Sequence, residues 1–246
     1  MPAPDELGQL SVVLINTRNP LNIGAAARAM SNFGFTDLRL VNPYETSFRE
    51  ARSAVGASEV LAAAREYKTV AEAVADCALV VGTTSAARRQ LEHPLRRLDE
   101  GAKIIRRRLS GGRAAILFGS EKRGLTNEDL SHCNWLLRIP TREAHCSMNL
   151  GQAVAVSLYE LARVRSTVKN KLVQKTEPAT SADLERISSL LSEALRLCGY
   201  QGSRSPSSVQ EDLRRLVRRM DLSAADGKLW LGILRQMAWK LRRVQP

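Results

Sequence analysis

Aromatic residues and cysteines are scarce in this chain of 246 residues, and long apolar runs are absent from it. Aromatic residues make up 4% of the sequence, too few for a sheet that binds RNA by stacking several bases on aromatic rings. The four cysteines lie far apart without a CxxC pair, which favours reduced thiols and a cytoplasmic location. No run reaches the ~18 apolar residues of a membrane span, and the first residues show no secretory signal. We therefore expect a cytoplasmic protein without a membrane segment.

Several catalytic and cofactor-binding motifs are also missing. The first apolar run is not followed by GxGxxG, and the chain has no GxxxxGK[ST], which argues against a dinucleotide site and a P-loop. No serine stands in a GxSxG elbow, and no His-Asp pair accompanies an obvious nucleophile, so triad hydrolysis is disfavoured. The pairs His132-Cys133 and His145-Cys146 match no common zinc spacing, and we expect no metal site.

The chain has a large excess of positive charge, with a formal net charge of +12 at pH 7. Such a charge favours a polyanionic partner, because basic side chains that neutralise phosphates release condensed counterions. Since aromatic residues are few, contact with the phosphate backbone of a nucleic acid is favoured over stacking on its bases. A basic surface without a specific partner and an anionic membrane surface are the alternatives.

Short apolar runs alternate with helical patterns along the first two thirds of the chain. The runs have the length and the branched residues of buried strands, and they lie at residues 10–15, 38–43, 77–84, 114–118 and 135–140. Helices are expected at residues 23–33 with Gly34 as the C-cap, at 50–64 with a break at Gly56, and at 70–75, 95–109 and from residue 150. Strands that alternate with helices predict an α/β fold with a mainly parallel sheet of about five or six strands.

The composition changes after Arg165. Residues 166–181 are polar, contain Pro178 and show no sustained apolar period, which is typical of a linker. Helical spacing then returns at residues 183–198, 209–220 and 229–244. We therefore expect a first domain over residues 1–165, the linker, and a small basic helical domain over residues 182–246. Because the helical domain is near the lower size limit for independent stability, contact with the first domain or with a partner chain is expected.

Residues 114–163 hold two of the predicted strands, and each of these strands ends in a polar turn. The first turn is GSEKRGL at residues 119–125, and the second spans residues 141–149 and leads into an amphipathic helix. In parallel sheets, ligands bind beyond the carboxyl ends of the strands. The sequence therefore predicts a ligand site at these two turns.

Three short motifs follow predicted strands. They are Asn22-x-Gly24-x-x-x-Arg28 with Gly34, then Phe118-Gly119-Ser120-Glu121-x-x-Gly124-Leu125, then Ile139-Pro140 followed by Ser147-Met148-Asn149-Leu150. In this order they resemble the SPOUT superfamily of RNA methyltransferases, in its TrmH-like 2′-O-ribose branch. The VNP sequence after the second strand and the basic helical tail look most similar to the TrmJ family of that branch.

The resemblance implies an enzyme that methylates the ribose of a cytidine or uridine at nucleotide 32 of the tRNA anticodon loop. It also implies S-adenosyl-L-methionine (AdoMet) as the cofactor, tRNA as the partner, a homodimer, and a trefoil knot on the C-terminal side of the first domain. A methyltransferase that acts on ribosomal RNA and a non-catalytic RNA-binding protein of the same fold are the alternatives.

The resemblance further implies the catalytic residues, which are Arg28, Asn22, Glu121, Ser147 and Asn149. An arginine, with a pKa above ~12, is a poor base, so Arg28 is expected mainly to clamp a nucleotide phosphate. Asn22 is expected to help hold Arg28 or the substrate, and Glu121 is expected to fix Arg28 or a backbone amide. Ser147 is expected near the target ribose.

Each of these residues also has a purely structural interpretation. Arg28 has the spacing of an exposed side chain on a helix. Asn22 and Asn149 each precede a predicted helix, so both are candidate N-caps. Glu121 and Ser147 stand in polar turns, where an ordinary solvated side chain is the alternative.

The cofactor pocket that the family implies is built from apolar walls and main-chain groups, as adenine recognition requires. The turns that match the family's AdoMet-binding positions contain Thr83, Thr84, Ser85, Gly119, Ile139, Cys146, Ser147 and Met148.

Two segments concentrate basic residues. Residues 88–113 carry nine Lys or Arg against three acidic residues, and residues 211–243 carry nine against four. Arg214, Arg215, Arg218 and Arg219 are spaced to form one stripe along a helix. We expect these surfaces to follow RNA phosphates. A solvated helix face, or a tail that braces the dimer, is the alternative.

Overall fold

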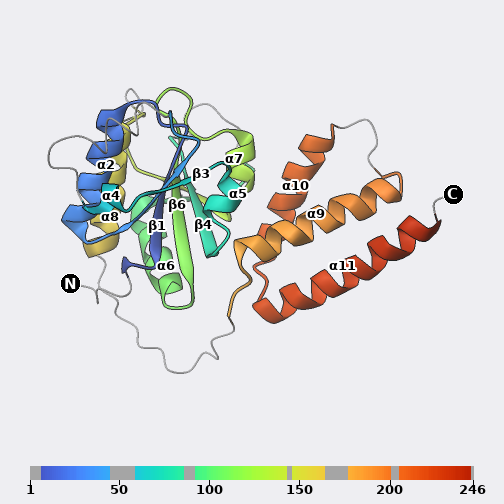
Figure 1. Cartoon of the computed structure of the whole chain (residues 1–246). Coiled ribbons are helices and arrows are strands. Elements are labelled where there is room, and N and C mark those ends of the chain that lie inside the picture. The colour runs from blue at the N-terminus through green and yellow to red at the C-terminus, as the bar shows by residue number, and fades with distance from the viewer. Residues whose placement is uncertain are drawn as a thin grey trace.

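The computed structural model describes residues 7–44, 59–85, 92–142, 146–163, 177–200 and 205–244. It has an α/β part, followed by a group of long helices that lies against one side of that part (Figure 1). Within these ranges, no helix is long and apolar enough to cross a membrane.

Seven strands form the sheet in the order β3-β2-β1-β6-β4-β7-β5, and every neighbouring pair is parallel. The central strands are almost wholly buried, because they carry apolar side chains on both faces of the sheet. The predicted α/β class and parallel sheet are therefore confirmed. The strands are β1 (Leu10–Ile15), β2 (Asp37–Val41), β3 (Arg65–Tyr67), β4 (Cys77–Thr83), β5 (Leu95–Arg97), β6 (Arg113–Phe118) and β7 (Trp135–Arg138).

Two short edge strands raise the number of strands above the predicted five or six. β3 pairs with β2, and β5 pairs with β7 at the opposite edge. The sequence predicts a helix from residue 95, but residues 95–97 form β5, and the helix α6 (Leu98–Leu109) begins after them. All residues of β5 are exposed, so no apolar pattern marks this strand, and only its pairing with β7 defines it.

Helices pack on both faces of the sheet, and each face has its own apolar core. The larger core lies between the sheet and α2 (Pro20–Phe33), α6 and α8 (Leu150–Arg163). The smaller core lies under α5 (Val70–Ala73) and α7 (Asn127–Ser131) on the opposite face. The short helix α4 (Glu59–Ala62) is the described end of the helix predicted at residues 50–64, and the rest of that prediction, with Gly56, lies outside the described residues.

The helix α2 begins at Pro20, earlier than the predicted Ile23. Its N-cap is Asn19, whose side chain accepts a hydrogen bond from the Leu21 backbone amide at 2.9 Å. Asn22 therefore lies inside the helix and is buried, so the interpretation of Asn22 as an N-cap is wrong. The helix ends at Gly34 as predicted, with a φ of 79° that suits glycine.

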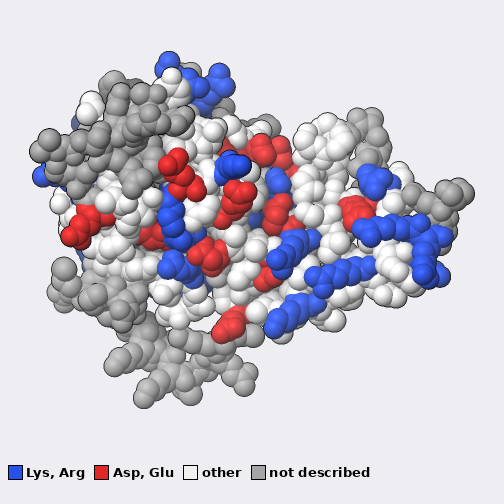
Figure 2. Space-filling model, viewed as in Figure 1, with Lys and Arg blue, Asp and Glu red and all other residues white. Residues whose placement is uncertain are grey.

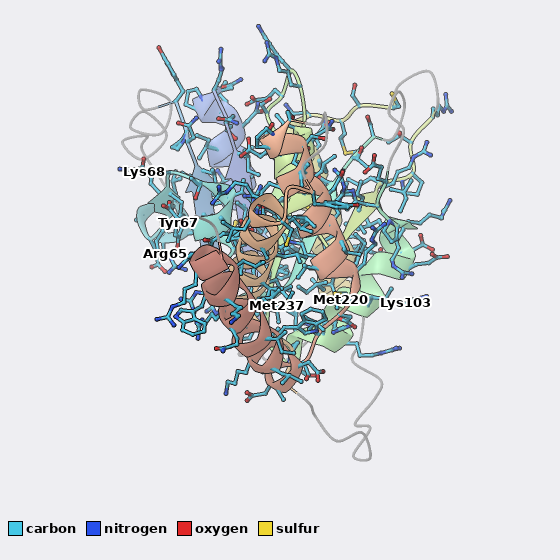
Figure 3. The ribbon with its side chains drawn as sticks, turned by 90° about the vertical axis from the view of Figure 1, so that its right-hand side faces the viewer. Arg65, Tyr67, Lys68, Lys103, Met220 and Met237 are labelled. Atoms are coloured by element: carbon cyan, nitrogen blue, oxygen red, sulfur yellow. The ribbon has the colours of Figure 1, made fainter. Side chains whose placement is uncertain are left out.

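The C-terminal part consists of α9 (Ser181–Leu197), α10 (Pro206–Arg219) and α11 (Ala224–Val244). α9 contacts both other helices and also β4 and α5, while α10 packs on α7. The shared apolar core is small, and apolar side chains such as Met220 and Met237 stay exposed on the outer surface (Figure 3). The C-terminal helices pack against the α/β part through α9 and α10.

The described end of the predicted linker packs with these helices. The Ala179 backbone amide donates to the Leu222 carbonyl oxygen at 2.9 Å, and Thr180 is the N-cap of α9. We therefore propose a first domain over residues 1–165, a linker confined to residues 166–176, and a helical domain from residue 177. The trefoil knot stays a prediction.

The arginines of α10 mainly hold this helix in place, so the predicted continuous basic stripe is wrong. Arg218 is 3% exposed and donates to the Ser181 hydroxyl at 2.9 Å. Two more arginines form ion pairs, Arg214 with Glu185 at 2.9 Å and Arg215 with Glu92 at 2.8 Å. The stripe lies where α10 meets α9 and the α/β part, and of its arginines only Arg219 is exposed.

Candidate active site

The carboxyl ends of β4, β6 and β7 open into a cavity of about 490 Å³ at the upper end of the sheet in Figure 1. The loop after β6, the turn after β4 and the described residues between β7 and α8 line it. Every residue that the resemblance assigns to the cofactor lies on the cavity wall, namely Thr83, Thr84, Ser85, Gly119, Ile139, Cys146, Ser147 and Met148. The sequence motifs therefore converge on one cavity of a size that suits a small-molecule ligand.

The loop of residues 119–125 folds back on itself beside the cavity. The Gly124 backbone amide donates to the Ser120 carbonyl oxygen at 2.8 Å, and Gly124 has a φ of 66°. At Gly119, a Cβ atom would lie 2.0 Å from the Gly124 carbonyl carbon. The shape of this wall therefore requires glycine at both positions.

Side chains from the three motifs form one hydrogen-bonded chain next to the cavity. Asn22 Nδ2 donates to Glu121 Oε1 at 2.8 Å, and Asn149 Nδ2 donates to Asn22 Oδ1 at 3.0 Å. Asn149 Oδ1 also accepts from the Gly151 backbone amide at 2.9 Å, so Asn149 is the N-cap of α8 as well. These hydrogen bonds connect the first turns of α2 and α8 to the loop after β6.

Glu121 is held as a carboxylate in this chain. Burial raises its pKa, but hydrogen bonds from the Asn22 side chain and from backbone amides outweigh this effect, so the pKa of Glu121 lies below its usual range. One of these amides is that of Asn19, at 3.4 Å. The sequence predicts that Glu121 fixes either Arg28 or a backbone amide. Glu121 accepts a hydrogen bond from the Asn19 backbone amide, and its side-chain partner is Asn22 and not Arg28.

Arg28 lies on the exposed side of α2, and none of the described residues bonds to its guanidinium group. Its charge is therefore open to an anionic group such as a phosphate. Ser147 and Met148 are exposed at the cavity, whereas the Thr83 hydroxyl donates to the Leu117 carbonyl oxygen at 2.8 Å. The preceding residues 143–145 lie outside the described ranges.

The motifs do not single out some of the residues at this site. Lys122, Arg123 and Thr141 also line the cavity, and Asn19 binds Glu121 through its backbone. The two basic residues lie within the GSEKRGL turn, so their place in the turn was a usable signal. The sequence around Asn19 carries no signal of a role in the site, because NPLN is equally typical of any helix start.

The His132-Cys133 pair is buried beside α7 and α10. Burial and the nearby Arg218 lower the pKa of His132 to about 3, and burial raises the pKa of Cys133 to about 12. Among the described residues, no group of His, Cys, Asp and Glu is arranged to hold a metal ion. His145 lies outside these residues.

The fold and the site define the class of the protein. Residues 9–159, which include the whole sheet and most of α8, match the SpoU rRNA methylase family, and the chain belongs to this family. It is therefore an RNA methyltransferase, built around the cavity at the carboxyl ends of its strands.

Individual relatives match the helical domain as well. A tRNA (cytidine/uridine/adenosine-2′-O-)-methyltransferase TrmJ of Pseudomonas aeruginosa is 36% identical over 240 residues, which cover 93% of each chain. A tRNA (cytidine/uridine-2′-O-)-methyltransferase TrmJ of Yersinia pestis is 34% identical over 234 residues, 93% of this chain and 91% of that protein. The crystal structure of TrmJ from Z. mobilis ZM4 matches with a TM-score of 0.81 at 31% identity, covering 92% of this chain and 98% of that one.

Proposed function

We propose that this protein transfers a methyl group from AdoMet to the ribose 2′-oxygen of a cytidine or uridine at nucleotide 32 of tRNA, in the cytoplasm. The hydrogen-bonded chain of Glu121, Asn22 and Asn149 beside the cavity carries the proposal. The names of the relatives support tRNA and the ribose oxygen as the acceptor. The resemblance of the three motifs supports the cofactor and the position in the anticodon loop.

The cavity suits AdoMet in size and in chemistry. Its volume of about 490 Å³ lies within the ~300–1,000 Å³ that is usual for such ligands. Leu137 and Ile139 offer an apolar surface to adenine, and Gly119 brings the backbone itself to the wall. When bound, AdoMet supplies a methyl group on a sulfonium ion, which is already a good electrophile.

The protein must align the ribose hydroxyl with this methyl group and assist the loss of its proton. We assign the permanently charged Arg28 to a phosphate of the target nucleotide, and Ser147 to contact with the ribose. Asn22, Asn149 and Glu121 keep the first turns of α2 and α8 in fixed positions, so that Arg28 and Ser147 act on the same nucleotide.

We also propose a homodimer that forms through α2 and α8. Their outer surface exposes Leu21, Val156 and Tyr159 by 78%, 37% and 55%. Gly24 has open space where a Cβ atom would lie, so another helix can approach closely there. Because Arg28 is also exposed on α2, a second copy on this surface would lie close to the site.

We propose that tRNA phosphates contact the exposed basic side chains of α6 and α11. Figure 2 shows Lys and Arg along the C-terminal helices, whereas basic and acidic side chains are mixed over the α/β part. The arginines of α10 contribute less, because most of them are engaged inside the protein. The exposed basic residues of these two helices are Lys103, Arg107, Arg108, Lys228, Arg235, Lys240, Arg242 and Arg243. Arg108 and Arg242 also form ion pairs, with Asp221 and Glu193.

Labelled methyl groups from AdoMet, incorporated into unmodified tRNA and ribosomal RNA and mapped by nuclease digestion, test the proposed function. A 2′-O-methyl group at nucleotide 32 of tRNA is the expected result. Label in ribosomal RNA alone would show a different substrate. Absence of transfer to either RNA, together with absence of AdoMet binding in calorimetry, would instead favour a non-catalytic RNA-binding protein.

A further inference from the structure

Two asparagines with left-handed backbone conformations lie side by side at the carboxyl edge of the sheet. Asn16 follows β1 with a φ of 52°, and Asn42 follows β2 with a φ of 45°. Asn42 Nδ2 donates to Asn16 Oδ1 at 2.8 Å. Positive φ angles are uncommon in residues other than glycine and concentrate at functional sites. The roles assigned above to Arg28, Ser147 and the chain of Glu121, Asn22 and Asn149 do not involve this pair.

The backbone fixes the position of the pair. The Asn16 amide donates to the Val41 carbonyl oxygen at 2.9 Å, and the Asn42 amide donates to the Tyr67 carbonyl oxygen at 3.0 Å. Tyr67 ends the neighbouring edge strand β3 (Figure 3). The pairing of three strands therefore continues to this point and holds both side chains at the edge of the sheet.

Each amide keeps one group for an external ligand. Asn42 Oδ1 is an acceptor and Asn16 Nδ2 is a donor, and within the described part of the chain neither forms another hydrogen bond. An acceptor next to a donor complements the Watson–Crick edge of a nucleobase, where the same two kinds of group stand side by side.

An exposed aromatic ring accompanies the amide pair. Tyr44 is 61% exposed, and its backbone amide donates to the Thr17 carbonyl oxygen at 3.2 Å. This hydrogen bond joins the chain just after Asn42 to the chain just after Asn16. A tyrosine held in this way suits stacking on a single base, which needs no aromatic-rich sheet.

We propose that Asn16, Asn42 and Tyr44 bind the base of the target nucleotide, Tyr44 by stacking and the amides through the Watson–Crick edge. The inference rests on the proposed function, because it concerns the base whose ribose is methylated. The position agrees with this role. The segment that begins at Asn16 leads directly into α2, which carries Asn22 and Arg28, so the base site and the ribose site adjoin at one edge of the sheet.

The pair can present either order of donor and acceptor. An amide can rotate by half a turn, which exchanges its oxygen and nitrogen atoms. If both amides rotate together, Asn16 Nδ2 donates to Asn42 Oδ1 and the hydrogen bond between the two side chains is kept. The group of Asn42 that faces a ligand is then a donor, and the group of Asn16 that faces a ligand is an acceptor. Cytosine, with an amino donor beside a ring acceptor, fits one state, and uracil, with the reverse order, fits the other. The pair would therefore accept both of the pyrimidines for which the relatives are named.

The test measures kcat/KM for methyl transfer at saturating AdoMet, on two tRNA transcripts that differ only by cytidine or uridine at the methylated position. In N16D, aspartate tolerates the left-handed backbone, but its oxygens only accept. Asn42 must then donate to the new carboxylate, which leaves two outward-facing acceptors. Cytosine and uracil each offer one donor next to one acceptor, so neither base matches two acceptors. We expect kcat/KM to fall about tenfold on both transcripts. N42D leaves the same two outward-facing acceptors and should have the same effect.

The stacking contact is tested separately. Y44A should lower kcat/KM about tenfold on both transcripts, whereas Y44F keeps the ring and should change little. Y200A after α9, outside the proposed dimer surface, is the matched control and should behave as wild type. AdoMet affinity in calorimetry should be the same in all variants.

The outcomes separate the two proposals. If the wild type methylates tRNA but N16D, N42D and Y44A keep the wild-type kcat/KM on both transcripts, the base site is wrong and the proposed function stands. If the wild type methylates neither transcript, the proposed function fails and the base site fails with it.

Discussion

Asn22 on α2 donates a hydrogen bond at 2.8 Å to Glu121 on the loop after β6, a residue 99 positions away in the sequence. The contact places a carboxylate at the N-terminus of α2, where backbone amides and the helix dipole stabilise negative charge. Because Asn22 is buried and lies between Glu121 and Asn149, it is the position of the site at which an added negative charge should matter most.

Asn22→Asp should destabilise the protein, because it removes the donor to Glu121 and brings two carboxylates together. We expect the free energy of unfolding at pH 7 to fall by roughly 1–3 kcal/mol. The loss should shrink at acidic pH, where one of the two carboxyl groups binds a proton and donates to the other. Denaturant unfolding over a pH series measures this effect, with Asn32→Asp as the control. Equal losses in the two variants would contradict the importance of the contact.

Arg28→Ala should abolish methyl transfer to tRNA while the protein stays folded and binds AdoMet. The side chain is exposed and makes no bond to a described residue, so its removal costs little stability. Single-turnover methylation, together with AdoMet calorimetry and thermal unfolding, tests this expectation. Methylation at the wild-type rate would remove Arg28 from the catalytic residues.

Gly119→Ala should weaken AdoMet binding at least about tenfold, because the added Cβ atom would lie 2.0 Å from the Gly124 carbonyl carbon and would push the cavity wall aside. Gly111→Ala is the matched control, since the nearest atom to its Cβ would be the Arg108 carbonyl oxygen at 3.6 Å. Calorimetric titration of both variants with AdoMet is the measurement. Wild-type affinity in Gly119→Ala would show that the wall does not hold the cofactor.

A partly buried charge cluster at Asp37 should make stability depend on pH. Burial raises the pKa of Asp37, but hydrogen bonds from Arg39, Ser11 and Arg65 outweigh burial and hold this pKa well below its usual range. The cluster therefore contributes its full stability above about pH 4, the pKa of an unfolded aspartate, and loses it as the pH falls further.

Asp37→Asn should lower the free energy of unfolding at pH 7 by roughly 3–5 kcal/mol, because Arg39, with a side chain only 1% exposed, loses a charged partner. The difference from wild type should narrow as the pH falls below about 4. Urea unfolding at several pH values is the measurement. A difference that stays constant down to about pH 2 would show that Asp37 does not titrate in the way described.

The sequence was most informative where structure depends on near neighbours. The run LSVVLI forms β1 at Leu10–Ile15 as predicted, and Gly34 ends α2, because branched apolar residues and a left-handed glycine act locally. By contrast, β5 at Leu95–Arg97 carries exposed side chains, and only its hydrogen bonds to β7 make it a strand. Asn22 is a second example. Its position in the sequence suits an N-cap, but the helix begins earlier, with Asn19 as the N-cap, so Asn22 lies inside it.

The sequence by itself determined the class of fold and placed a ligand site at the turns of residues 119–125 and 141–149, because short apolar runs that end in polar turns predict strands whose carboxyl ends meet at one edge of a parallel sheet. The other predicted residues of the cavity wall came from the resemblance of the motifs. Only the tertiary structure decided the partners of the polar side chains. The spacing of Arg214, Arg215 and Arg218 is compatible with a solvent-exposed helix face and with an interface inside the protein. The packing of α10 directs these side chains toward partners in the protein. Asn22 meets Glu121, and Asn42 meets Asn16, for the same reason: a hydrogen bond depends on which distant surfaces the fold brings within about 3 Å of each other.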